Sequence, residues 1–255
     1  MVYSVPGGGL VCSYVISTKD GLMVVDPGSI GIADAAEKFI RALPGRKMGE
    51  MRAIIATHFH IDHIGGIGRM LRSCPDETFV FFHRLVNDYL AGKRDLPRLH
   101  NWFSAFLPAA IKSLRRFRKP SQLLVESLAG IPLPGFGTRF RPPIPLERVK
   151  WFCSEGVVRC ETGLDGWEII ETTGHTDDSL SLYNETTGEL LCGDLILNLD
   201  REGPRLNSFC QGSASILKTF KFLSETITPR IIYPGHGDII RSDHNALLSV
   251  NCSMD

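Results

Sequence analysis

Four potential metal ligands lie within six residues of one another, directly after an apolar segment. They are His58, His60, Asp62 and His63, and residues 52–57 before them (RAIIAT) have the composition of a short buried strand. Side chains alternate in an extended chain, so His58 and His60 project to the same side and can bind one metal ion. Asp62 and His63 follow at the turn and can face a neighbouring position. The motif therefore predicts a metal site at the end of a strand.

Three further candidate ligands each follow a predicted strand in the second half of the chain. His175 lies in Thr-Thr-Gly-His-Thr-Asp, Asp194 in Leu-Leu-Cys-Gly-Asp, and His236 in Tyr-Pro-Gly-His-Gly-Asp. A lone histidine or Gly-Asp pair after a strand is an ordinary loop feature, but their order and placement after His63 indicate one set. Strands and helices mix in two similar halves, which predicts sheets covered by helices.

Composition bounds the class of protein. The 255 residues are 43% hydrophobic, 22% are charged, and 28 Lys/Arg balance 28 Asp/Glu. These values exclude a disordered tail protein, a collagen-like fibre and a uniformly basic nucleic-acid binder, and they suit one domain over 1–255. We expect no transmembrane helix and no secretory signal. Seven cysteines without a C-x-x-C motif predict neither a disulfide framework nor a zinc ribbon, so we expect a cytoplasmic protein.

Residues 84–150 differ from the rest of the chain. They hold 13 Lys/Arg and 4 Asp/Glu, a net charge of +9, and predict a largely helical lid or insertion. Pro108 interrupts the helical pattern, which predicts a kink or two short helices. The apolar residues at helical spacing are Leu99, Trp102, Phe103, Phe106, Ala110, Ile111, Leu114 and Phe117.

This basic segment has three interpretations. It is a lid helix packed on the core, or a substrate lid in which Arg115, Arg116 and Arg118 bind an anionic acyl compound such as an acyl thioester of a phosphorylated carrier. The third and less favoured interpretation is a membrane-surface contact through 99–119 or a nucleic-acid groove. Overall neutrality argues against nucleic acid, so we expect a small-molecule acyl substrate as the partner. The oligomeric state stays open.

The motifs between residues 26 and 236 resemble those of the metallo-β-lactamase superfamily, especially its glyoxalase-II-like and lactonase-like hydrolases. The resemblance implies an α/β (α+β) fold, an αββα sandwich with two metal ions at one edge of its sheets. It implies that His58, His60 and His175 bind the first metal. Asp62, His63 and His236 would bind the second, and Asp194 would bridge both. Asp26, before Pro-Gly, matches an aspartate that supports these ligands; a plain turn-initiating role is the alternative.

Imidazole and carboxylate ligands without thiolate favour Zn²⁺, with Fe or Mn as alternatives. Two metals bridged by a carboxylate lie about 3.5–4 Å apart and share a hydroxide that attacks a carbonyl. Asp62 would orient the water or shuttle its proton. We therefore predict a dinuclear hydrolase that cleaves an ester, thioester or lactone.

Other functions remain open from the sequence. β-Lactamases of this superfamily have Cys or Ser where Asp194 stands, which disfavours penicillin hydrolysis. The main alternative is a mononuclear-iron oxidoreductase similar to persulfide dioxygenases. Weaker alternatives are a nuclease or phosphodiesterase and a non-catalytic effector-binding protein.

Overall fold

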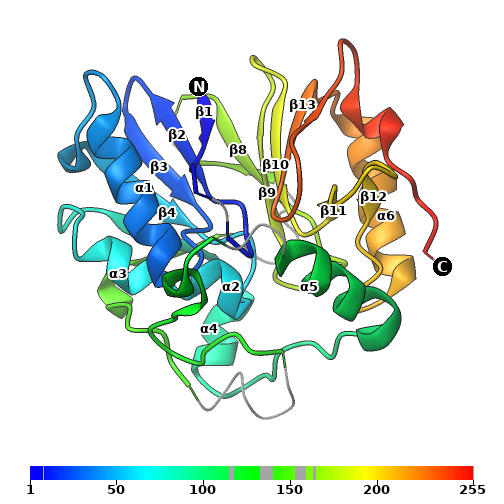
Figure 1. Ribbon diagram of the computed structural model, residues 1–255, viewed down its shortest axis with the longest axis horizontal. Helices are drawn as coiled ribbons and strands as arrows, with labels where there is room; N and C mark the ends of the chain where they lie inside the picture. The colour runs from blue at the N-terminus through cyan, green and yellow to red at the C-terminus, as the bar shows by residue number, and fades with distance from the viewer. Residues whose placement is uncertain (8, 115–117, 133–139, 153–158, 163–164, 255) are drawn as a thin grey trace. The chain divides into compact units, whose positions relative to one another are not determined.

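The computed structural model describes residues 1–254 except 8, 115–117, 133–139, 153–158 and 163–164. The chain divides into two compact units (Figure 1). The first unit comprises Met1–Leu96 and Arg116–Phe152, and the second comprises Pro97–Arg115 and Cys153–Asp255. The predicted insertion at 84–150 is thus shared between the units. A single domain with an inserted lid stays a prediction.

The first unit contains a six-stranded sheet in sequential order, β1-β2-β3-β4-β5-β6. The first two pairings are antiparallel and the remaining three are parallel. Apolar, β-branched segments form the central strands, which are buried on both faces, as is typical of parallel sheets. The strands are β1 (Val2–Ser4), β2 (Tyr14–Thr18), β3 (Gly21–Val25), β4 (Met51–Ile55), β5 (Phe79–His83) and β6 (Val149–Phe152).

Helix α1 (Ile30–Ala42) lies along this sheet (Figure 1). Ser29 caps it, because its hydroxyl accepts a hydrogen bond from the backbone N–H of Ile32 at 3.4 Å. Its buried face includes Ala36 and Ile40, which pack in one core with apolar residues of β2 to β5. The unit's other helices are α2 (Ile61–Ile64), α3 (Ile67–Leu71), α4 (Leu85–Leu90) and the 3₁₀ turns η1 (Met48–Glu50), η3 (Pro120–Leu123) and η4 (Leu146–Arg148).

The chain from 61 to 71 forms two short helices, α2 and α3. Gly65 and Gly66 separate them, because the backbone there packs tightly on the loop after β3. A Cβ atom on Gly66 would lie 2.4 Å from the carbonyl oxygen of Ser29. The backbone N–H of Gly28 also donates to the carbonyl of His63 at 3.1 Å. These contacts fix the metal-binding motif against the end of β3.

The second unit contains a six-stranded sheet of order β14-β13-β10-β9-β8-β7. Only β10 and β13 pair in parallel among these strands. Helix α6 (Ser213–Thr226) covers one face, where Ile216 and Leu223 pack with Leu190, Cys192 and Ile232. The strands are β7 (Arg159–Glu161), β8 (Trp167–Glu171), β9 (Leu180–Asn184), β10 (Glu189–Gly193), β13 (Ile231–Pro234) and β14 (Ile240–Arg241). The unit also contains a hairpin, β11 (Ile196–Leu197) with β12 (Arg205–Leu206), and the turn η5 (Ala246–Ser249).

Residues 102–114 belong to this second unit and form a π-helix, η2 (Trp102–Phe106), followed by α5 (Leu107–Leu114). Pro108 is the second residue of α5 and has no backbone N–H to donate, and it lies directly after the π-helical turn. The expected interruption is therefore present as a change of helix type. Within the described residues, no helix has the length and apolar character that a membrane crossing requires.

Candidate metal centre

The His-x-His-x-Asp-His motif begins at the carboxyl end of parallel strands in the first unit. Strands β3 and β4 are neighbours, with Val25 opposite Ile55, so the residues that follow both strands meet at one edge of the sheet. The backbone N–H of Asp26 donates to the carbonyl of Ile55 at 2.9 Å. Asp26 is thereby placed beside the loop that contains His58.

Asp26 is a buried carboxylate that organises this loop. Its Oδ1 accepts the backbone N–H of Thr57 at 2.8 Å, and its Oδ2 accepts the Thr57 hydroxyl at 2.7 Å. The same Oδ2 lies 2.9 Å from Nδ1 of His63, so Nδ1 carries the hydrogen and Nε2 is the ligand atom. Because Thr57 donates its hydroxyl hydrogen to Asp26, its oxygen accepts from Nδ1 of His58 at 3.2 Å. His58 therefore also presents Nε2.

The structure brings the four predicted ligands of the motif together. Nε2 of His58 lies 2.9 Å from Nδ1 of His60, and the ring centroids of His58 and His63 are 4.0 Å apart. All three imidazoles are buried. The carboxylate of Asp62 lies 3.8 Å from Nε2 of His63, and its side chain is 31% exposed. Asp62 is thus the one member of the motif with substantial access to solvent.

In the second unit a backbone carbonyl orients His175. The carbonyl oxygen of Phe209 lies 2.6 Å from Nδ1 of His175. A carbonyl only accepts hydrogen bonds, so Nδ1 carries the hydrogen and Nε2 is the ligand atom. The side chain of Asn207 stabilises this loop, since its Oδ1 accepts the N–H of Phe209 at 3.0 Å.

Asp194 lies between two imidazoles of the same unit. Its Oδ2 is 3.6 Å from Nε2 of His175 and 3.3 Å from Nε2 of His236. Asp194 follows β10 and His236 follows β13, and these strands are parallel neighbours, so both residues lie at one edge of the sheet. The structure therefore brings the three predicted ligands of the second unit together.

The separations within each unit suit divalent metal ions. Metal–nitrogen bonds of about 2.0–2.1 Å in a tetrahedral site place ligand atoms about 3.3 Å apart. In the first unit the ligand atoms of His58 and His60 are 2.9 Å apart, and those of His63 and Asp62 are 3.8 Å apart. In the second unit the carboxylate of Asp194 lies 3.6 Å from His175 and 3.3 Å from His236. Burial raises the pKa of the Cys210 thiol, which favours its protonated form. The donors are imidazole nitrogens and carboxylate oxygens, as Zn²⁺ and Fe²⁺ both accept.

The predicted substrate-binding arginines are Arg115, Arg116 and Arg118. Arg115 and Arg116 lie outside the described residues. Arg118 is exposed in the first unit, and its backbone N–H donates to Oε1 of Gln122 at 2.7 Å. An acyl-binding role for these three residues stays a prediction.

Sequence reasoning missed three residues that support the histidines. Thr57 directly precedes the motif, and a hydroxyl next to a buried histidine is a signal that could have found it. Asn207 and Phe209 are 32 and 34 residues from His175, and nothing in the sequence singles them out. Phe209 acts through its carbonyl, which every residue has.

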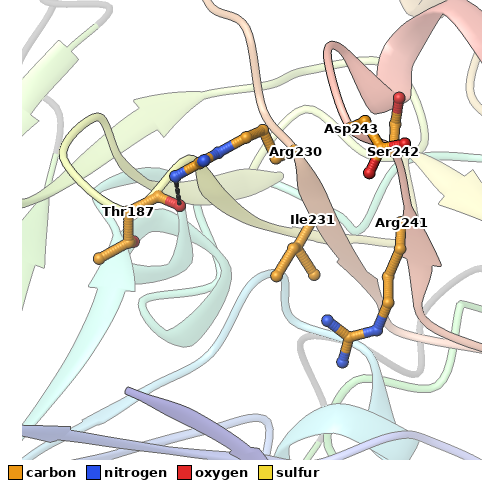
Figure 2. A pocket seen from close by; sticks show the side chains of 6 residues that line it. All are labelled: Thr187, Arg230, Ile231, Arg241, Ser242 and Asp243. Atoms are coloured by element: carbon orange, nitrogen blue, oxygen red, sulfur yellow. Dashed lines mark hydrogen bonds between the residues drawn. The ribbon is translucent and has the colours of Figure 1, made fainter.

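A separate hollow of about 530 Å³ lies at the opposite end of β13 from His236 (Figure 2). The side chain of Arg230 points toward Thr187, whose carbonyl accepts its hydrogen bond at 3.3 Å. The lining residues include no imidazole, so this hollow is not a metal site of the kind described above. They are Thr187, Arg230, Ile231, Arg241, Ser242 and Asp243.

Comparison with known proteins identifies the family. A family model described as the metallo-beta-lactamase superfamily matches residues 6–250. The chain belongs to the metallo-β-lactamase superfamily. The resemblance stated from the motifs and the mixed α/β fold are thereby confirmed.

Individual members of this superfamily are distant from the chain. The "Probable metallo-hydrolase YqjP" of Bacillus subtilis (strain 168) is 24% identical over 248 residues, which cover 92% of this chain and 69% of YqjP. The solved structure of ST1585 from Sulfolobus tokodaii is 17% identical with a TM-score of 0.58, covering 94% of this chain and 81% of that one. A structure titled "Peroxy diiron species of chemotaxis sensor ODP" is 14% identical with a TM-score of 0.60, covering 97% of this chain and 88% of that one. At these identities the structures show the fold alone.

Family membership and relatives named as metallo-hydrolases support a metal-dependent hydrolase at the general level. The histidine and aspartate clusters of the two units agree with divalent metal binding.

Proposed function

We propose that this superfamily member is a dinuclear metal-dependent hydrolase of an ester, thioester or lactone. In this proposal the ligands are assigned to two ions as the family pattern implies. The first ion is bound by His58, His60 and His175, the second by Asp62, His63 and His236, and Asp194 bridges them.

The position of Asp194 carries the proposal. One carboxylate oxygen lies within 3.6 Å of the Nε2 atoms of both His175 and His236, which the family pattern assigns to different ions. A carboxylate that serves two ligand sets favours a dinuclear centre over a mononuclear one. The orientation of His58, His63 and His175 through Nδ1 supports the same reading, because each is left with Nε2 for a metal.

Two divalent ions, when bound by these residues, would lower the pKa of a bound water to about 7 and would polarise the substrate carbonyl. Asp62 is suited to accept the proton of that water at a carboxylate oxygen and return it to the leaving group, because its side chain is partly exposed. The buried Asp26–Thr57 pair holds the two neighbouring histidines in a fixed orientation during this transfer. Water adds to the acyl carbon, and the alcohol or thiol leaves with the proton.

Metal content and hydrolysis together test the proposal. Protein purified without a His tag or added metal is analysed for zinc, iron and manganese per chain, then assayed with an aryl ester, an acyl thioester and a lactone. We expect two metal ions per chain, most favourably zinc, and hydrolysis of at least one substrate class. Asp62→Asn should weaken binding of the second ion and lose turnover, whereas the exposed His244→Ala control should change neither.

Two outcomes overturn the proposal. One iron per chain with oxygen uptake on persulfides would identify a mononuclear dioxygenase instead. Protein that takes up no metal on reconstitution would indicate an effector-binding protein without metal-dependent turnover.

A further inference from the structure

The second unit has a hollow at the amino end of β13, away from the metal ligands of that unit (Figure 2). Its volume of about 530 Å³ lies in the range of about 300–1,000 Å³ that is typical of small-molecule sites. The four residues of β13 lie between this hollow and His236, which places it about 13 Å or more from that ligand. The hollow is therefore a separate candidate site within the second unit.

The turn between β9 and β10 fixes Arg230 at the hollow. The backbone N–H of Arg230 donates to the carbonyl of Gly188 at 2.8 Å, and its Nη2 donates to the carbonyl of Thr187 at 3.3 Å. Gly188 has a φ of +66°, and a Cβ atom there would lie 3.1 Å from Nε of Arg230, so the glycine lets the guanidinium lie against the turn. Within the described part of the chain this guanidinium makes no other hydrogen bond, so its remaining N–H groups can donate to a ligand.

Arg241 supplies a second guanidinium to the same hollow. Strands β13 and β14 are antiparallel with Ile231 opposite Arg241, so these two side chains lie on the same face of the sheet. The side chains of Arg230 and Arg241 lie on either side of Ile231 in Figure 2. Among the residues that the structure describes, the Arg241 guanidinium has no hydrogen-bond or ion-pair partner. Its N–H groups can therefore also donate to a ligand.

Ser242 adds a hydroxyl group beside the two arginines. Its backbone N–H donates to the carbonyl of Arg230 at 2.9 Å, which joins the end of β14 to the start of β13. Its Oγ accepts the backbone N–H of His244 at 3.2 Å, so the hydroxyl hydrogen is left to donate. Asp243 is the one carboxylate of the lining, which thus has two positive charges and one negative charge. The excess of donors and positive charge favours an anionic ligand.

We propose that this hollow binds a small phosphate monoester. The planar guanidinium groups of Arg230 and Arg241 present paired N–H donors that match phosphate oxygens, and the Ser242 hydroxyl supplies a further donor. A phosphate group fills only a small part of the hollow, so the organic part of the ester lies against Ile231 and Thr187. This proposal does not depend on the proposed hydrolysis, and it goes beyond it by adding a ligand site that the metal centre does not contain.

Isothermal titration calorimetry of the full, metal-loaded chain tests this proposal. The probes are ribose 5-phosphate, inorganic phosphate and ribose, each at low and at high salt. We expect ribose 5-phosphate to bind, inorganic phosphate to bind more weakly and ribose not to bind, and salt should weaken both phosphates. Arg230→Gln and Arg241→Gln should each weaken binding of ribose 5-phosphate about tenfold, because each removes charged donors.

Two further variants control this measurement. Arg201 is an exposed arginine of the same unit, in the turn between β11 and β12, and Arg201→Gln should bind ribose 5-phosphate as the unchanged protein does. Arg241→Lys keeps the charge but loses the planar pair of donors, so its affinity should fall between those of the unchanged protein and Arg241→Gln. All variants should keep melting temperatures close to that of the unchanged protein, because the three arginines are exposed.

Three results would overturn the proposal. The first is no binding of ribose 5-phosphate at millimolar concentration. The second is an equal loss of affinity in Arg201→Gln and Arg241→Gln, which would indicate a general effect of surface charge. The third is binding that survives both Arg230→Gln and Arg241→Gln but disappears when a chelator removes the metal, which would place the phosphate at the metal centre.

Discussion

In the first unit, side chains orient the metal-binding histidines, whereas in the second unit a backbone carbonyl orients His175. Asp26 and Thr57 hold His63 and His58 through hydroxyl and carboxylate groups. The carbonyl of Phe209 holds His175. Side-chain support can be removed by one substitution, but carbonyl support remains whatever residue stands there. The two halves should therefore respond differently to mutation, although they present the same ligand chemistry.

The largest expected effect comes from removing the carboxylate that both imidazoles of the second unit share. Asp194→Ala removes the oxygen near Nε2 of His175 and His236. We expect loss of bound metal and a fall in kcat/KM of more than about 100-fold, which is the upper end of the loss caused by removing a residue that only orients a metal ligand. Metal analysis and initial rates measure both quantities. Asp243→Ala, an exposed aspartate of the same unit, is the control, and a fall of less than tenfold for Asp194→Ala would contradict a bridging role.

Two variants compare orientation of a histidine by a side chain with orientation by a backbone carbonyl: Asp26→Ala and Phe209→Ala. Asp26→Ala removes the acceptor for His63 and for both groups of Thr57, so we expect metal affinity to fall about 10- to 100-fold. Phe209→Ala removes the ring but keeps the carbonyl, so metal affinity should change by less than that factor. Competition with a chromophoric chelator measures both affinities. Equal losses would show that packing, not the hydrogen bond, orients His175.

Glycines that admit close backbone contact give the next largest effect. Gly237, beside His236, has φ +111° and a Cβ there would lie 2.2 Å from the carbonyl oxygen of Asn198. Gly237→Ala therefore adds backbone strain and overpacking, and we expect the free energy of unfolding to fall by about 2–4 kcal/mol.

Two other glycines separate the effect of overpacking from the effect of backbone strain. Gly66 in the first unit has no positive φ, but a Cβ atom there would lie 2.4 Å from a carbonyl oxygen. Gly66→Ala should therefore lower the free energy of unfolding by about 1–3 kcal/mol from overpacking. Gly203 has φ +92° with nothing nearby, so Gly203→Ala should cost about 1 kcal/mol from strain alone. Urea unfolding measures all three. A Gly237→Ala variant no less stable than Gly203→Ala would rule out the close contact.

The contrast between local side-chain contacts and contacts from distant parts of the chain explains how much of the structure the sequence could predict. The motif at 58–63 is local, so its ligands could be predicted from strand periodicity, and the apolar runs that became β3, β4 and β10 were recognisable. The edge strands β1, β6 and β14 were missed, because an edge strand with exposed residues has no continuous apolar run. Helical spacing predicted an apolar stripe over 99–117, but periodicity does not say whether a stripe is covered. Phe103 and Ile111 are in fact exposed.

The smallest expected effect concerns Asp200, whose ion pair attaches α5 to the second unit. The hydrogen bond from Lys112, with further contributions that include Arg205, lowers the pKa of Asp200 below its usual value. The charged carboxylate is thus favoured by folding, so its contribution is present above the usual pKa of about 3.9 and is lost as the pH falls through the lowered value. Asp200→Asn should reduce the free energy of unfolding by about 0.5–1 kcal/mol near neutral pH, and the difference should disappear in acid. Urea titrations at neutral and acidic pH measure this difference. Glu225→Gln, which loses only an exposed pair with Lys221, should be neutral at both. A difference for Asp200→Asn that persists in acid would mean that packing of the side chain, rather than its charge, holds α5 in place.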